Sequence, residues 1–107
     1  WKYQFGINVE IDLARAFDYY KQASDLDDGE GSFQVAEFYH LGIYVERNEF
    51  EAFKYFLKSA QTGFEKGIIK SALCYFYGYG VVINMSGFNA WLNKIDNETK
   101  HFINLNA

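Results

Sequence analysis

The sequence predicts an all-α protein in which helix pairs repeat along the chain to form a solenoid. The chain matches itself when it is shifted by 36 residues, which is the signature of a repeat architecture. Apolar residues recur at helical spacing between glycines that end each helix. No segment shows the two-residue alternation of a half-buried strand, and the chain contains no proline. We therefore expect helices throughout.

The repeat rests on columns of residues that coincide at the 36-residue spacing. Three columns are identical in all three copies, and several others are conservative, which is hard to attribute to chance. The identical columns are Tyr3, Tyr39 and Tyr75; Gly6, Gly42 and Gly78; and Val9, Val45 and Val81. The conservative columns include Asp12, Asn48 and Asn84; Ala16, Ala52 and Phe88; and Tyr19, Tyr55 and Trp91.

The chain is expected to form one domain over residues 1–107. Its 107 residues are 50% hydrophobic and 21% aromatic, which suits a compact domain or one piece of an extended one. The repeat columns divide it into a partial repeat, two complete repeats and a C-terminal extension or cap. These parts cover residues 1–27, 28–63, 64–96 and 97–107.

Each repeat is expected to fold as a helix, a tight turn and a second helix. In the first repeat, the tail of the leading helix should turn at Gly6, and a trailing helix should cover residues 13–24 after Asp12. In the second, a helix over 32–41 should stop at Gly42, and Asn48 should cap a helix that ends near Gly63. The apolar side chains that this trailing helix should bury are Phe50, Ala52, Phe53, Phe56, Leu57 and Ala60.

The third repeat follows the same plan, with helices expected over residues 65–77 and 85–94. Gly78 and Gly80 should end the leading helix and let the chain turn tightly, while Asn84 caps the next helix. A phosphate-binding loop is not expected here. The dinucleotide-binding pattern requires a third glycine where Ile83 stands, and a strand rather than a helix before the loop.

The pattern Tyr75-x-x-Gly78-x-Gly80-Val81-x-x-Asn84 resembles the Sel-one-like repeat, a relative of the tetratricopeptide repeat. The resemblance covers residues 1–96. It implies a right-handed α/α superhelix and a non-enzymatic scaffold for macromolecular complexes. The chain departs from the pattern where Asn8 and Tyr44 replace the second loop glycine, Phe88 replaces an alanine, and Ile95-Asp96 replaces the Ala-Ala pair.

By analogy with tetratricopeptide geometry, the leading helices should line a concave groove. The residues beside the packing positions would then form an apolar and aromatic face, the composition of an interface centre. This expected partner-binding face comprises Phe33, Glu37, His40, Leu41, Ile69, Leu73, Phe76 and Tyr77. The leading hypothesis is an adaptor that binds a peptide segment or a helix of a partner protein in this groove.

Two other functions stay open at this stage. The chain could be a structural spacer that self-associates end to end, or a regulatory subunit of a membrane-associated, cell-wall or quality-control complex. It could also be a thiol-dependent hydrolase, with Cys74 and His40 as nucleophile and base. Family members linked to β-lactam binding carry a cysteine pair in each repeat, so the single cysteine argues against that branch.

Several partner classes are disfavoured by composition and motif. A net charge of −4 without a basic run lacks the electrostatic footprint for nucleic acid. Residues 71–93 carry no charge, but asparagines and glycines interrupt them, so direct membrane insertion is not expected. The acidic residues 25–30 lack the spacing of a calcium loop, and we expect neither metal nor cofactor. Asn97 begins a glycosylation acceptor, Asn-Glu-Thr, that matters only in a secretory lumen.

Overall fold

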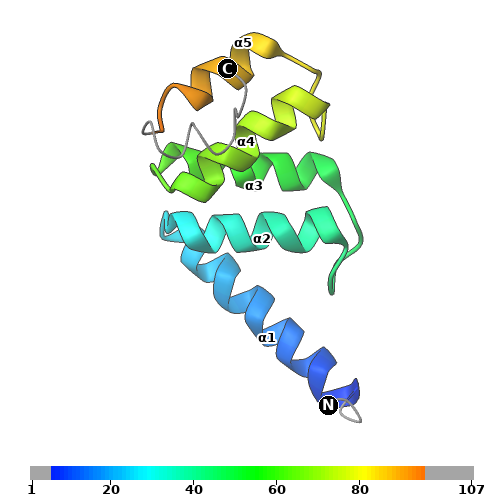
Figure 1. Ribbon diagram of the computed structural model, residues 1–107. Coiled ribbons are helices and arrows are strands. Elements are labelled where there is room, and N and C mark those ends of the chain that lie inside the picture. Colours follow the sequence, from blue (N-terminus) through cyan, green and yellow to red (C-terminus); the bar gives the residue numbers. More distant parts are fainter. Residues whose placement is uncertain (1–5, 96–107) are drawn as a thin grey trace.

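The computed structural model describes the backbone of residues 6–95 and the side chains from residue 12 onward. Within that range the chain forms five helices and no strand. Successive helices stack one on the next along a single direction (Figure 1). The predicted all-α repeat fold is thus confirmed. The helices are α1 (Gly6–Asp25), α2 (Gly29–Leu41), α3 (Glu49–Gln61), α4 (Glu65–Tyr77) and α5 (Met85–Leu92).

The 36-residue period appears directly in the backbone. Helices α2 and α4 begin and end 36 residues apart, and so do the starts of α3 and α5. Asn48 and Asn84 cap α3 and α5, each accepting a hydrogen bond at its side chain from a backbone N–H three residues on. Their own N–H groups donate to the carbonyls of Tyr39 and Tyr75, both at 2.9 Å. The predicted caps and turns of these two repeats are confirmed.

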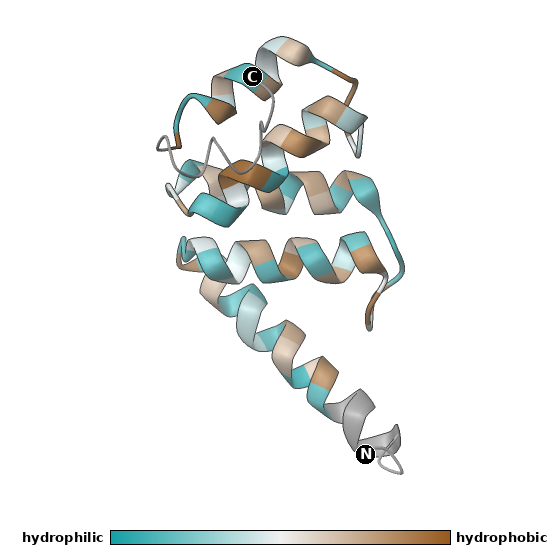
Figure 2. Ribbon diagram, in the orientation of Figure 1, coloured by the Kyte–Doolittle hydropathy of each residue, from teal (hydrophilic) through white to brown (hydrophobic). Residues whose placement is uncertain are grey.

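Hydrophobic and hydrophilic residues are mixed along each ribbon (Figure 2), and the buried apolar side chains form two clusters. The main core lies between α2, α3 and α4, and a smaller one lies between α3, α4 and the end of α5. The main core consists of Phe33, Val35, Ala36, Ala52, Tyr55, Phe56 and Cys74. The smaller core consists of Ala60, Ile68, Leu92 and Ile95.

Two glycines at the repeat spacing bring neighbouring repeats together. A Cβ on Gly31 would lie 2.6 Å from the Cβ of Ala23, at the end of α1. A Cβ on Gly67 would overlap Ser59 in the same way at the end of α3. At these points the glycine backbone of each leading helix therefore packs directly on the small side chains of Ala23 and Ser59 in the trailing helix before it.

The first repeat differs from the prediction, since α1 runs without interruption from Gly6 to Asp25. No turn forms at Gly6, and Asp12 lies inside the helix rather than capping it. In the third repeat the turn packs onto the start of α3, and in the second the ring of Tyr44 contacts Phe17 of α1. Among the described helices α1 packs mainly against α2, and an uninterrupted helix keeps the backbone hydrogen bonds that a turn near its start would break.

Three smaller expectations are also corrected. Helix α2 begins at Gly29 rather than residue 32, because the side chain of Asp28 accepts a hydrogen bond from the N–H of Gly31 and caps the helix earlier. Helix α5 ends at Leu92 instead of residue 94. Phe50 was expected to be buried but is 75% exposed, because it lies in the first turn of α3 on its outer side. The expected cap at 97–107 lies outside the described residues.

Gly80 provides a test of the packing between repeats. Its φ is +70°, and a Cβ there would overlap the carbonyl oxygen of Glu49 and lie 2.9 Å from Phe53 Cβ. Gly80→Ala should therefore lower the free energy of unfolding by about 3 kcal/mol, from backbone strain and steric overlap together. Gly63 is the matched control, because its φ is +91° but no atom lies within 4 Å of the added Cβ.

Gly63→Ala should cost only about 1 kcal/mol, the strain of the left-handed backbone alone. Urea denaturation followed by circular dichroism measures both values. Equal losses in the two variants would show that the loop does not pack on α3.

Ser71 provides a second test, because its hydroxyl is buried without a hydrogen-bond partner in the described part of the chain. Ser71→Ala should leave the protein as stable or raise its unfolding free energy by about 1 kcal/mol, since an unsatisfied buried hydroxyl is removed. Ser32 is the control, since its hydroxyl bonds Ser24 at 2.7 Å in the interior. Ser32→Ala should destabilise by about 1 kcal/mol, and a loss of that size in Ser71→Ala would reveal a bond to its hydroxyl.

Candidate partner-binding face

Helices α2 and α4 meet on one side of the solenoid and form a cleft there. The cleft has a volume of about 170 Å³, and its floor includes the buried side chains of Phe56 and Cys74. Its walls and rim carry both aromatic and cationic groups. The lining residues are His40 from α2, Phe56 from α3, Lys70, Leu73, Cys74 and Tyr77 from α4, and Tyr79 from the following turn.

A continuous row of ring contacts runs past this cleft from α5 to α2. Phe88 lies 5.2 Å from Phe76, Phe76 lies 4.9 Å from Tyr77, and Tyr77 stacks on Tyr79 at 5.5 Å between ring centroids. Tyr79 then contacts the ring of His40 at 5.7 Å. We call these five residues the aromatic row. Since neighbouring rings fix one another, the exposed edges of the row form a preordered surface.

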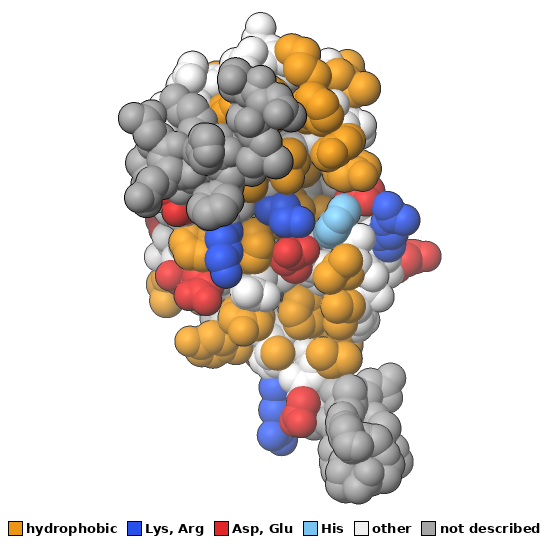
Figure 3. Space-filling model, in the orientation of Figure 1, with side chains coloured by type: hydrophobic (Ala, Val, Ile, Leu, Met, Phe, Trp, Pro, Cys, Tyr) orange, Lys and Arg blue, Asp and Glu red, His pale blue; other side chains and the backbone are white. Residues whose placement is uncertain are grey.

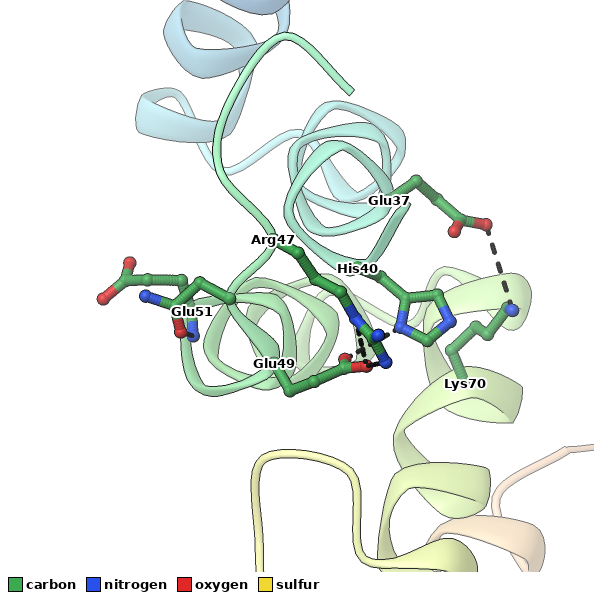
Figure 4. Close-up of polar contacts among 7 residues, drawn as sticks. Glu37, His40, Arg47, Glu49, Glu51 and Lys70 are labelled. Carbon is green, nitrogen blue, oxygen red and sulfur yellow. Dashed lines mark hydrogen bonds and ion pairs between the residues drawn. The ribbon is translucent and has the colours of Figure 1, made fainter. Parts of the chain in front are cut away.

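Charged residues border the cleft on the α2 side. His40 Nδ1 lies 2.8 Å from Glu49 Oε1, and Arg47 Nη2 donates to Glu49 Oε2 at 2.6 Å (Figure 4). Partial burial raises the pKa of Glu49, but the hydrogen bonds from His40 and Arg47 outweigh it and hold that pKa below its ordinary value. Both carboxylate oxygens of Glu49 are thus committed to contacts inside the protein.

Across the cleft, Lys70 Nζ lies 4.0 Å from Glu37 Oε2 and 5.9 Å from the centre of the Phe56 ring. Figure 4 shows Lys70 and Glu37 on one side of the His40 ring and Glu49 on the other. On this face the space-filling view shows a band of charged and histidine side chains between two areas of hydrophobic side chains (Figure 3). The face therefore combines an apolar surface with a few polar groups at its centre, as ligand sites commonly do.

The structure brings together four residues of the predicted face and separates the others. His40, Leu73 and Tyr77 line the cleft, and Glu37 lies beside it through its contact with Lys70. Leu41 and Phe76 are exposed but do not line it. Ile69 packs instead against the smaller core.

Phe33 was expected to be exposed on this face and is not. Its ring is only 7% exposed, because it packs against Phe56 of α3 and against Phe64 just before α4. The second turn of α2 is covered on that side by α3 of the same repeat and by Phe64 at the start of the next one. Phe33 is therefore a core residue.

Three contributors to the site were missed from the sequence. Helical periodicity does not indicate Lys70, because a lysine on a helix ordinarily points to solvent. Tyr79 lies in the turn rather than in a leading helix, and Glu49 begins a trailing helix. The 36-residue alignment places Tyr79 opposite Ile43, and a large apolar residue at both positions of the turn could have indicated it.

The chemistry of Cys74 is that of a core thiol. Burial, and to a smaller extent the nearby charge of Glu49, raise its pKa to about 12. The thiolate that would act as nucleophile is therefore scarce near neutral pH. Within the described residues no group of three or more potential ligands could hold a metal ion, and no helix there is long and apolar enough to cross a bilayer.

Comparison with known families agrees with the helix pairs described above. The family model "Sel1 repeat" matches residues 3–28, 29–64 and 67–86, which together make up more than half of the chain. The chain belongs to the Sel1 repeat family. Sel1 repeat proteins are generally scaffolds for protein interactions, and the family is generally non-enzymatic. A comparison with curated protein sequences gives no match.

Two solved structures resemble this Sel1 repeat chain. Helicobacter pylori cysteine rich protein B is 27% identical, with a TM-score of 0.71 over 73% of this chain and 59% of that one. A Sel1 repeat protein from Oxalobacter formigenes is also 27% identical, with a TM-score of 0.62 over 80% of this chain and 38% of that one. This chain thus spans less than two thirds of either. It shares their fold, but its single cysteine can form no disulfide within the chain.

The buried state of Cys74 in this Sel1 repeat protein can be measured by alkylation. Iodoacetamide should label the native protein far more slowly than a free cysteine at pH 7, because the thiol is covered and its pKa is near 12. At pH 9 only about 0.1% of a thiol with a pKa near 12 is ionised, so native labelling should stay slow, whereas a free thiol with a pKa of about 8.5 would then be mostly ionised. Labelling in urea is the positive control. Fast native labelling at pH 7 would restore the thiol-enzyme hypothesis.

Proposed function

We propose that this chain is a non-enzymatic scaffold that binds a peptide segment or a helix of another protein along the face formed by α2 and α4. The observation that carries the proposal is the aromatic row, whose rings pack against one another and still keep exposed edges beside the cleft. Tyr77 is 55% exposed and Phe76 is 40% exposed. Aromatic groups held in this way bind partners at low entropic cost, because little side-chain freedom remains to be lost.

The chemistry of the site favours binding over catalysis. The cleft holds His40, but its Nδ1 is engaged by Glu49, and the thiol of Cys74 is protonated at neutral pH. A general base must reach the proton that it removes, and a nucleophile must be activated. The neighbouring groups here stabilise the fold and orient the histidine ring instead.

The proposal predicts that Tyr77 and Phe76 contribute more to binding than to folding. Random 12-residue peptides displayed on phage can be selected on the purified chain, and the enriched peptides can be resynthesised with fluorescein and titrated. Tyr77→Ala should weaken their binding by about 1 kcal/mol or more, as truncation of an aromatic anchor does. Phe76→Ser should weaken binding as well. Its folding cost should stay below the roughly 3 kcal/mol of a core phenylalanine, since its ring is partly exposed.

Lys58→Ala is the matched control, because Lys58 lies on α3 in a different surface depression from the cleft. This variant should bind the selected peptides like the wild type. Denaturation curves of all variants separate loss of binding from loss of folding. Peptides that depend on Lys58 and not on Tyr77 would place the partner on the opposite side of the solenoid.

A further inference from the structure

The geometry of the cleft points to the kind of segment that it binds. We propose that the cleft takes a peptide in which a large apolar side chain stands next to an aspartate or a glutamate. The apolar side chain enters the cleft, and the carboxylate binds Lys70 at its rim. This inference rests on the proposed function and adds the chemical class of the partner.

The volume of the cleft sets the size of the anchor. A ligand pocket for a drug-sized molecule occupies about 300–1,000 Å³, well above the 170 Å³ found here. An apolar cavity of about 150 Å³ is known to hold one benzene ring. The cleft therefore accepts one phenylalanine, leucine or methionine side chain, and a longer partner must lie along the surface outside it.

The floor and walls of the cleft favour an apolar anchor. Phe56 and Cys74 form the floor, and the side chains of Leu73, Tyr77 and Tyr79 surround it. A polar side chain placed there would lose its hydration without gaining matching hydrogen bonds on the floor. An apolar side chain would instead bury its surface and that of the exposed aromatic rings at once.

The charges at the rim of the cleft favour an acidic over a basic residue next to the apolar anchor of the peptide. Glu49 has both oxygens engaged by His40 and Arg47, so it is a poor partner for an incoming cation. Lys70 lines the cleft, whereas Glu37 does not. The distance of 4.0 Å between Lys70 and Glu37 is longer than the roughly 2.7–2.9 Å of a charge-assisted hydrogen bond. Lys70 can therefore donate a hydrogen bond to a carboxylate of the partner in place of its long contact with Glu37.

His40 strengthens the same preference. Its Nδ1 is held by Glu49, and Figure 4 shows the rest of the ring on the side of Lys70. A carboxylate bound at Lys70 would thus also lie near the outer edge of the imidazole ring. A lysine or arginine of the partner in this position would meet two groups that carry or can carry positive charge.

The experiment uses the fluorescent peptides selected on the full 107-residue chain, each compared with a copy in which Asp or Glu is replaced by its amide. Lys70→Met should lower the affinity for the acidic peptides about tenfold, as loss of one charge-assisted hydrogen bond does. Glu37→Gln should raise the affinity for the same peptides severalfold, because it removes the carboxylate that competes for Lys70. Lys66→Met is the control, since it makes the same charge change on an exposed residue of α4 and should have no effect.

A double-mutant cycle then tests whether Lys70 and the peptide carboxylate interact directly. If the peptide carboxylate contacts Lys70, its amide copy should bind wild type and Lys70→Met equally well. Peptides that need Tyr77 but bind Lys70→Met undiminished would overturn this inference and leave the proposed function standing. Enriched peptides without acidic residues would also overturn this inference alone. Peptides whose binding does not depend on Tyr77, or no enrichment at all, would count against this inference and the proposed function together. Melting curves of each variant confirm that it is folded.

Discussion

The close approach of Gly31 and Gly67 to the small residues Ala23 and Ser59 of the preceding helix sets the geometry of the stacked helices. At these two positions, 36 residues apart, a leading helix lies on the trailing helix before it, where even one methyl group would overlap its neighbour. A helix pair of this length cannot bury its apolar face alone, so its stability depends on the next pair. The glycines let the pairs approach until Phe33, Phe56 and Cys74 pack as one core across the repeats.

The same stacking creates the proposed binding face. The cleft belongs to no single repeat, because His40 comes from the second, while Leu73, Tyr77 and Tyr79 come from the third. The turn that carries Tyr79 is held in place by Gly80, whose backbone lies directly on the start of α3. That start also carries Glu49, which orients His40. Stability between repeats and the arrangement of the site therefore rest on overlapping contacts.

Sequence reasoning succeeded where a feature depends on nearby residues, and it failed where a feature depends on a neighbouring layer. The caps at Asn48 and Asn84 and the left-handed residues Gly42 and Gly78 follow from local backbone chemistry, and all four are found. Helical periodicity shows that Phe33 and Phe50 lie on apolar faces, but it does not show which face is covered. Phe56 of α3 and Phe64 just before α4 bury Phe33, whereas Phe50 stays in solvent.

The sequence by itself determined the helical content, the 36-residue period and the turns of the second and third repeats, because hydrogen bonds and backbone preferences within a few residues control them. Only the tertiary structure decided that α1 continues past Gly6 and Asp12, and that Lys70 and Tyr79 join His40 around one cleft. These outcomes depend on contacts between segments about 30 residues or more apart, whose distance and orientation are fixed by how the helix pairs stack. A one-dimensional pattern records the spacing of residues along each helix, whereas the site arises from the packing between helices.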